Sequence, residues 1–274
     1  MSAAHIVGAG VAGLAAAEKL IADGWIARGG TIALYDQAPR AGGRCRSWVD
    51  QALGCEIDNG NHLLLACNPT TLGLIAKHAA PDALAGPDRA RFDFADLRDG
   101  AVWSLRPNAG PIPWWIFAPN RRTPGGGPRA HLAGAKLLFA GRDAVAADCF
   151  DVDGPLYERL WRPLCEAVMN ADTGEAAAAL LGRVVRDTFA GGAAAMRPFI
   201  ARRSLDDALI DPLRQAIEAA GGTFRFGARL RAIEVEGDRA RRLRFAESTI
   251  DLADDDVVLL ATPPDAAAAL LPNL

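Results

Sequence analysis

The sequence has few of the features that mark disulfide-stabilised, zinc-binding or membrane-spanning proteins. Its five cysteines include no C-x-x-C spacing, so we expect neither a disulfide framework nor a metal site, and interpret them as small apolar side chains in a reducing cytosol. No apolar run approaches the ~20 residues that a spanning helix needs, and no basic and apolar leader precedes the first strand-like stretch. We therefore expect a cytoplasmic protein, or one peripheral to the inner face of the cytoplasmic membrane. The five cysteines are Cys45, Cys55, Cys67, Cys149 and Cys165.

Net charge and length further limit the kinds of protein that this chain could be. The formal net charge is −3, which provides no electrostatic attraction for nucleic acid. Half of the 274 residues are hydrophobic, so the chain can bury the core of one large or two modest domains. Nothing in the sequence indicates the oligomeric state.

The most informative stretch is the amino end, HIVGAGVAGLAAAEKL (residues 5–20). An apolar run, glycines in G-x-G-x-x-G spacing (Gly8, Gly10 and Gly13) and an Ala-rich helical pattern are typical of a dinucleotide-binding unit. Gly8 makes the tight turn, Gly10 lets the backbone approach a pyrophosphate, and Gly13 lets the helix pack close to the strand. A second strand, TIALYD, ends at Asp36, where a carboxylate accepts hydrogen bonds from ribose hydroxyls. The alternative is a chance glycine-rich turn, which the complete strand–helix–strand context disfavours.

A second glycine pair follows in RAGGRCRS. Gly42 and Gly43 suit a loop whose backbone lies against a phosphate, and Arg44 suits pairing with its charge. A plain Rossmann dehydrogenase has no need of this element. An enzyme that holds an extended FAD at both its adenosine and its flavin end does need it.

Periodicity and turn signals predict the remaining elements. Ser204 is a natural N-cap for one of the helices. The predicted elements are helices over 11–23, from 68 or 70 to 78, 131–150, 156–169, 176–189 and 204–220, a hairpin over 91–107, and short strands between 223 and 264.

The stretches GAGVAGLAAAEKL, APRAGGRCRS and IDNGNHLLL resemble the amine oxidase and phytoene desaturase superfamily of FAD enzymes. Within it the chain is most similar to the hydroxysqualene dehydroxylases of bacterial hopanoid synthesis (squalene-associated FAD-dependent desaturases), through residues 159–192 and 202–222. The resemblance implies an α/β fold, in which a mostly helical substrate domain is inserted into a Rossmann-like FAD-binding domain with a parallel sheet. It places the FAD-binding domain at 1–66 and 204–274 and the substrate domain at 67–203.

The same resemblance implies further site residues. Gly60 and Asn61 would lie at the cofactor, the backbone around Leu230 would flank the adenine, and LLATPP (residues 259–264) would be a central strand. The implied reaction reduces hydroxysqualene to squalene with reduced FAD as the hydride donor.

Loss of hydroxide requires a proton donor or an ionising environment. His62 is the candidate by residue type, because its unperturbed pKa is ~6.5, and Asp58 is a second candidate. The alternative for His62 is a packed structural histidine, and Asp58 alternatively caps its turn.

A Pro- and Trp-rich loop over 106–130 interrupts the regular patterns. Trp114 and Trp115, followed by Ile116 and Phe117, stand near Arg121, Arg122 and Arg129, which suits a loop that dips into lipid headgroups. The alternative is an ordinary connection that covers the core.

Members of the resembled family continue well beyond the point where this chain stops, at Leu274. The chain is therefore expected to lack their last segment near the flavin. This leaves two alternatives to the dehydroxylase. One is a desaturase-like or amine oxidase-like flavoenzyme that runs the flavin in the opposite redox direction. The other is a truncated, non-enzymatic remnant or half of a split flavoprotein.

Overall fold

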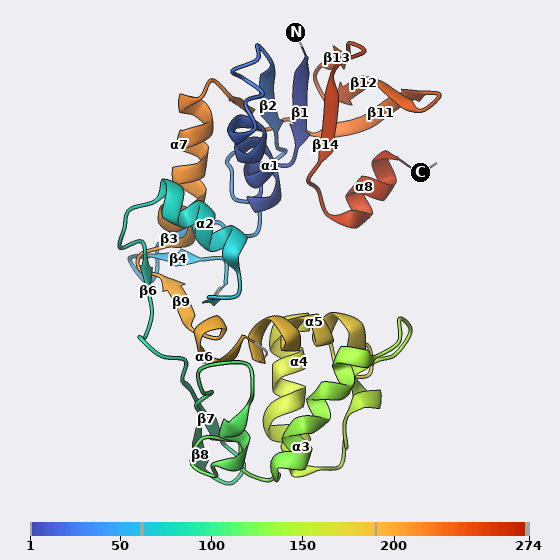
Figure 1. The fold of residues 1–274 in the computed structure, drawn as a ribbon. Coiled ribbons are helices and arrows are strands. Elements are labelled where there is room, and N and C mark those ends of the chain that lie inside the picture. The colour runs from blue at the N-terminus through green and yellow to red at the C-terminus, as the bar shows by residue number, and fades with distance from the viewer. Residues whose placement is uncertain (1, 61–62, 190, 272–274) are drawn as a thin grey trace. The chain divides into compact units, whose positions relative to one another are not determined.

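The computed structural model of the chain describes residues 2–60, 63–189 and 191–271 (Figure 1). These form two compact units. Unit 1 consists of residues 1–62, 70–85 and 201–274, and unit 2 of residues 63–69 and 86–200.

Unit 1 is built on a four-stranded parallel sheet in the order β10-β2-β1-β14. The strands are β10 (Thr223–Arg225), β2 (Thr31–Tyr35), β1 (Ala3–Val7) and β14 (Val257–Leu260). A mixed α/β fold with a parallel sheet is therefore confirmed. The prediction that LLATPP forms a central strand is wrong for the described residues, because β1 takes the centre and β14 pairs only with β1.

Helix α1 (Val11–Ala22) follows β1 directly and packs against α7 (Asp211–Ala219), in agreement with the predicted helices over 11–23 and 204–220. The second of these opens with the π-helical turn η5 (Asp206–Ile210), and the Ser204 hydroxyl accepts a hydrogen bond from the Asp207 N–H at 3.2 Å. Ser204 therefore has the capping position that its residue type predicts.

The segment of α2 (Pro69–His78) belongs almost entirely to unit 1 rather than to the predicted substrate domain. The reason is a polar contact with α1. Lys77 and His78 both reach the nearly buried carboxylate of Glu18, and the hydrogen bond from Lys77 lowers the pKa of that carboxyl. A paired carboxylate of this kind is stable at low exposure, whereas an unpaired one is not.

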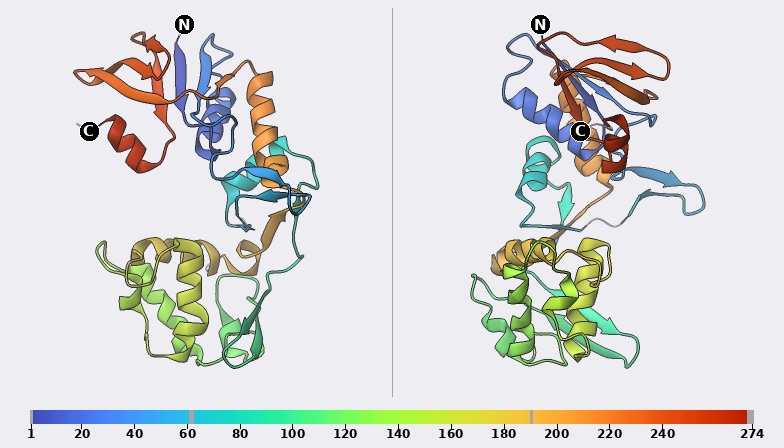
Figure 2. Two further views of the ribbon diagram at one scale, coloured as in Figure 1. Left: turned by 180° about the vertical axis from the view of Figure 1, so that it is seen from behind. Right: turned by 90° about the vertical axis from the view of Figure 1, so that its right-hand side faces the viewer.

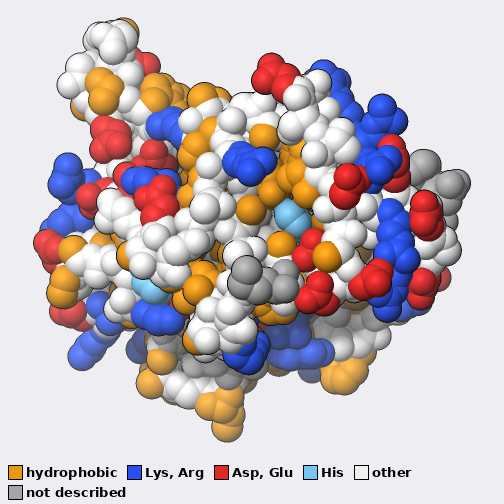
Figure 3. Space-filling view, turned by 90° about the horizontal axis from the view of Figure 1, so that it is seen from above, with side chains coloured by type: hydrophobic (Ala, Val, Ile, Leu, Met, Phe, Trp, Pro, Cys, Tyr) orange, Lys and Arg blue, Asp and Glu red, His pale blue; other side chains and the backbone are white. Residues whose placement is uncertain are grey.

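Two antiparallel elements complete unit 1. The larger is the sheet of β11 (Leu230–Glu236), β12 (Arg239–Phe245) and β13 (Thr249–Asp251), and the smaller is the hairpin of β3 (Ser47–Asp50) and β4 (Cys55–Asp58). Arginines of β12 pair with acidic residues around them, such as Arg242 with Glu234. The space-filling view from above shows acidic and basic side chains interspersed over that face (Figure 3). Short elements of the chain are β5 (Leu64–Leu65), β6 (Leu84–Ala85), β9 (Pro198–Ala201) and α8 (Pro264–Leu270).

Unit 2 is mostly helical (Figure 2). Its hairpin of β7 (Phe92–Asp96) and β8 (Ala101–Leu105) confirms the hairpin predicted over 91–107. The helical elements pack around buried residues such as Leu137, Cys165 and Leu181. They are η1 (Trp114–Phe117), α3 (Pro128–Leu132), η2 (Ala133–Phe139), η3 (Ala146–Cys149), η4 (Tyr157–Trp161), α4 (Arg162–Met169), α5 (Ala178–Phe189) and α6 (Gly192–Ala195).

The predicted helices over 156–169 and 176–189 are confirmed by η4–α4 and α5. The first opens with a π-helical turn directly before Pro163, which has no N–H to continue an α-helical ladder. The predicted continuous helix over 131–150 is wrong. It breaks into α3, η2 and η3, and Gly134 lies so close to the Trp161 ring that a Cβ there would come within 2.2 Å of it.

None of the helices in the described residues is long and apolar enough to cross a membrane. The five cysteines are free thiols, and the described part of the chain has no cluster of side chains that would hold a metal ion.

Neighbouring leucines of α5 offer a test of the core of unit 2. Leu181 is 0% exposed and Leu180 is 61% exposed. We expect Leu181→Ala to lower the free energy of unfolding by about 2–5 kcal/mol, because it leaves a cavity. The matched Leu180→Ala should change it by less than ~0.5 kcal/mol. Urea unfolding followed by circular dichroism measures both, and equal losses would contradict this packing.

Candidate functional site

The turn between β1 and α1 leaves no room for side chains at two of its glycines. Gly8 has φ +108° and donates its N–H to the Tyr35 carbonyl at 2.7 Å, and a Cβ there would lie 2.5 Å from the Ala261 carbonyl oxygen. A Cβ on Gly13 would lie 1.8 Å from the Gly8 carbonyl oxygen. The start of α1 therefore rests on the turn itself, which is the packing that the spacing of these glycines predicts.

Gly10 differs from its neighbours because the protein does not exclude a side chain there. A Cβ at Gly10 would come no closer than 3.9 Å to another protein atom. Gly10 is also the N-cap of α1, and no side chain caps this terminus. The N–H groups of the first turn and the positive end of the helix dipole thus suit an anionic ligand that approaches closely at Gly10.

Asp36 directly follows β2 and is fixed by two backbone groups. One carboxylate oxygen accepts the Ala9 N–H and the other accepts the Ala38 N–H, each at 2.8 Å. A carboxylate has about four acceptor positions, so this leaves capacity for ribose hydroxyls. The Asp36 carbonyl also accepts the Ala228 N–H at 2.8 Å, which brings the segment before β11 to the same place. Leu230 packs there with Val7 and Tyr35.

The loop of Gly42 and Gly43 contacts the glycine-rich turn between β1 and α1. The Gly42 N–H donates to the Ala9 carbonyl at 2.9 Å, and Gly10 and Gly42 form a parallel bridge. Gly43 has φ +59°, and a Cβ there would lie 3.2 Å from the Gly10 Cα. The structure thus brings Asp36 and Gly43 to Gly10, which is far from both of them in the sequence.

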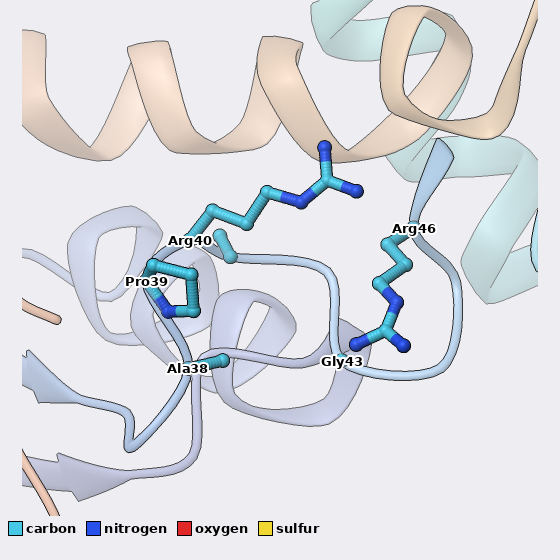
Figure 4. Close-up of a pocket in the computed structure, with 6 residues that line it drawn as sticks. Ala38, Pro39, Arg40, Gly43 and Arg46 are labelled. Carbon is cyan, nitrogen blue, oxygen red and sulfur yellow. The ribbon is translucent and has the colours of Figure 1, made fainter. Parts of the chain in front are cut away.

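A small pocket of ≈ 110 Å³ adjoins this junction (Figure 4). Figure 4 shows the Arg46 guanidinium directed towards Gly43, while Arg40 extends away from it. Arg40 donates to the Ser47 carbonyl, and its Nη1 lies 3.4 Å from Oδ2 of Asp206. Burial raises the pKa of the Asp206 carboxyl. The lining residues are Ala38, Pro39, Arg40, Ala41, Gly43 and Arg46.

The sequence interpretation missed Arg46. The side chain of Arg44, the predicted phosphate partner, is exposed, and neither arginine has a carboxylate within 4 Å in the described part of the chain. Both are therefore available to an anion. No local sequence pattern indicated Arg46, because residues 43–45 form a turn, closed by the hydrogen bond from the Cys45 N–H to the Gly42 carbonyl at 3.0 Å, that brings it back towards Gly43.

Asp58, at the end of β4, has a structural function. Its Oδ1 accepts the Ser47 hydroxyl at 2.6 Å and the Leu205 N–H at 2.9 Å, which fixes the start of η5. This role is structural, as in the alternative to catalysis, but its partners are Ser47 and Leu205 rather than the turn that follows Asp58. Gly60 lies in an exposed bend, whereas Asn61 and His62 lie outside the described residues.

Unit 2 contains a larger apolar cavity of ≈ 270 Å³. Its walls include Trp115, which is 4% exposed because its ring packs against His131 and Phe189. The prediction that Trp115 contacts lipid is therefore wrong, whereas Trp114 is 50% exposed. Burial lowers the pKa of His131, and its Nδ1 lies 3.1 Å from the Gly127 carbonyl oxygen.

The comparisons with known proteins agree with the arrangement of unit 1. The family model described as flavin containing amine oxidoreductase matches residues 11–274. The chain is 42% identical over 272 residues to a hydroxysqualene dehydroxylase of Rhodopseudomonas palustris and 37% identical over 270 residues to one of Sinorhizobium fredii. Each match covers 98% of this chain but 64% of the relative, so the chain spans less than two thirds of their length.

A solved structure has the same fold. The oxidoreductase from Methanosarcina mazei superposes with a TM-score of 0.65 over 98% of this chain and 60% of that chain. At 15% sequence identity this similarity concerns the fold alone.

The close approach of α1 to its turn can be tested with two glycine-to-alanine changes. We expect Gly13→Ala to lower the free energy of unfolding by about 1–3 kcal/mol or more, because the new methyl group overlaps the Gly8 carbonyl. Gly73→Ala in α2 is the matched control, since no atom lies within 4 Å of its Cβ position. It should raise stability by about 0.5–1 kcal/mol. Urea denaturation measures both, and a neutral Gly13→Ala would contradict the contact.

The buried His131 predicts a pH dependence. The unfolded chain binds a proton at this histidine with a pKa of about 6.5, whereas burial lowers this pKa in the folded chain, so the unfolded chain takes up the proton first as the pH falls. The neutral His131 side chain thus contributes to the free energy of unfolding in full above pH ~6.5, and this contribution is lost as the pH falls below that value. We expect the stability of the wild type relative to His131→Phe to decrease between pH 7.5 and 5.5. A constant difference in urea midpoints would contradict this.

Proposed function

Because the chain belongs to the flavin-containing amine oxidoreductase family, we propose that unit 1 binds a flavin adenine dinucleotide at the junction of its two glycine clusters. The observation that carries the proposal is the meeting of Gly10, Asp36 and Gly43. The ribose of the adenosine would bind to Asp36, and the backbone around Leu230 would flank the adenine. The pyrophosphate would lie at Gly10 and the uncapped start of α1.

The second glycine loop would hold the other part of the same ligand. Gly42 and Gly43 allow its backbone to lie against a phosphate, and Arg44 and Arg46 provide positive charges that no carboxylate in the described residues neutralises. Gly60 and Asn61 would follow towards the flavin ring. The adenosine and flavin ends would thus be held by loops on either side of Gly10.

We further propose that the reaction is the dehydroxylation of hydroxysqualene to squalene. The identity of 42% and 37% to two hydroxysqualene dehydroxylases supports this reaction over others of the family. In the net reaction a carbon–hydroxyl bond is replaced by a carbon–hydrogen bond and water is released. A bound reduced flavin supplies the hydride.

The residues of this chain would bind and orient the reactants and protonate the departing oxygen. His62 remains the predicted proton donor. Asp58 is less suited, because its Oδ1 already accepts two hydrogen bonds within unit 1. In protein that has taken up flavin, His62→Ala is expected to abolish turnover and to leave the flavin absorption unchanged. Near-normal turnover would remove His62 from the proposal.

The direction of the flavin chemistry separates the dehydroxylase from a desaturase or an amine oxidase. Incubation with hydroxysqualene and reduced flavin without oxygen should yield squalene. Incubation with phytoene and oxidised flavin should yield no desaturated product. The reverse result would favour the desaturase, and a colourless protein that takes up no added FAD would favour a non-enzymatic remnant.

The role of Asp36 is tested by FAD titration of two aspartate variants. Asp36→Ala removes the proposed ribose acceptor, so we expect FAD affinity to fall by about tenfold or more, from the loss of hydrogen bonds to a charged group. Asp50→Ala is the matched control, because Asp50 likewise accepts two backbone N–H groups in a turn of unit 1. Equal affinities for the two variants would contradict a ribose contact at Asp36.

A further inference from the structure

The loop between β8 and α3 in unit 2 turns apolar side chains in two directions. Pro113, Trp115 and Ile116 line the apolar cavity. Their neighbours in the sequence are exposed: Ile112 is 74% exposed, Trp114 50% and Phe117 65%. Large apolar side chains grouped at the surface of a folded protein mark an interaction site more often than isolated ones do.

Hydrogen bonds hold this loop in place, so the exposure of its apolar side chains is a property of the fold. The buried Asn108 accepts the Trp115 N–H at 3.1 Å and donates to the Ile112 carbonyl at 2.9 Å. Arg122 donates to the Ile116 carbonyl at 2.6 Å. Arg121 donates to the Arg106 and Pro107 carbonyls, and its guanidinium lies 4.7 Å from the centre of the Trp114 ring.

The charges carried by the segment that contains the loop all have one sign. Residues 100–142 contain five arginines and one lysine but no aspartate or glutamate, although the whole chain has a net charge of −3. No ion pair within the described residues involves Arg106, Arg121, Arg122 or Arg129. The segment therefore combines exposed apolar side chains with arginines that form no ion pair within the described residues.

One residue in the wall of the cavity behind the loop is also exposed. Leu132 both lines the cavity and is 48% exposed, and it lies at the end of α3, three positions after the exposed Arg129. Residues three apart on a helix share a face, so Arg129 lies on the same side of α3 as Leu132. The wall of the apolar cavity therefore includes a residue that is exposed beside a positive charge.

From these observations we propose that Ile112, Trp114, Phe117 and Leu132, with the arginines around them, form a docking surface for an anionic phospholipid bilayer. Apolar and aromatic side chains insert at the boundary of headgroups and acyl chains, and arginines bind the phosphates. A single-stranded nucleic acid would also attract aromatic and basic groups. The aliphatic side chains of Ile112 and Leu132 and the apolar cavity favour lipid. The proposal does not depend on the dehydroxylation reaction.

The test is sedimentation of the full chain with vesicles of phosphatidylcholine, with and without phosphatidylglycerol. We expect binding to the anionic vesicles that weakens with added salt, since surface charges are screened. Phe117→Ser should lower the partition coefficient by about tenfold or more, from the lost burial of one aromatic side chain. Leu97→Ser is the control, because Leu97 is equally apolar and 93% exposed in the β7–β8 turn.

A second pair of variants tests the charge. Arg129→Gln should lower the partition coefficient by about fivefold, and Arg89→Gln, which removes the same charge from an exposed position elsewhere in unit 2, should change it less than about twofold. The proposal is overturned if the wild type does not sediment with anionic vesicles, or if Phe117→Ser and Leu97→Ser bind equally. It is also overturned if the protein binds a single-stranded oligonucleotide while leaving the vesicles unbound.

Discussion

The structure of the candidate site depends on one contact, between the start of α1 and the carbonyl of Gly8. With only 1.8 Å between that oxygen and the position of a Gly13 Cβ, the helix can begin where it does only because residue 13 has no side chain. This contact sets the direction of α1, and the glycine at its N-cap, Gly10, leaves its first N–H groups without a side-chain cap. The proposed binding of an anion at Gly10 rests on that backbone geometry.

Around this turn, segments far apart in the sequence are joined by backbone and carboxylate hydrogen bonds. Asp36 fixes Ala9, Gly42 binds the Ala9 carbonyl, and Ala228 binds the Asp36 carbonyl. The same groups that would hold an adenosine and a pyrophosphate therefore also hold the fold together. A substitution at Gly13 would therefore disturb both the proposed ligand site and the stability of the fold. The side chains of Arg44 and Arg46 take no part in these hydrogen bonds, so substitutions there would affect ligand binding alone.

The sequence was sufficient where local rules decide the outcome. The glycine-rich turn, the strand that leads to Asp36, the hairpin over 91–107 and the Ser204 cap depend on near neighbours, and the structure has them as predicted. It was insufficient where distant packing decides. The edge position of β14 depends on how four strands assemble, the break after α3 on the Trp161 ring against Gly134, and the burial of Trp115 on the rings of His131 and Phe189. Arg46 was missed because its proximity to Gly43 arises only when the loop folds back.

The central claim is that Gly10, Asp36 and Gly43 hold one flavin nucleotide between them. A crystal structure of the protein soaked with FAD tests it most directly. The account predicts a pyrophosphate within hydrogen-bond distance of the N–H groups at the start of α1 and a ribose against the Asp36 carboxylate. A nucleotide bound elsewhere in unit 1, with Gly10 and Asp36 free of it, would contradict the account.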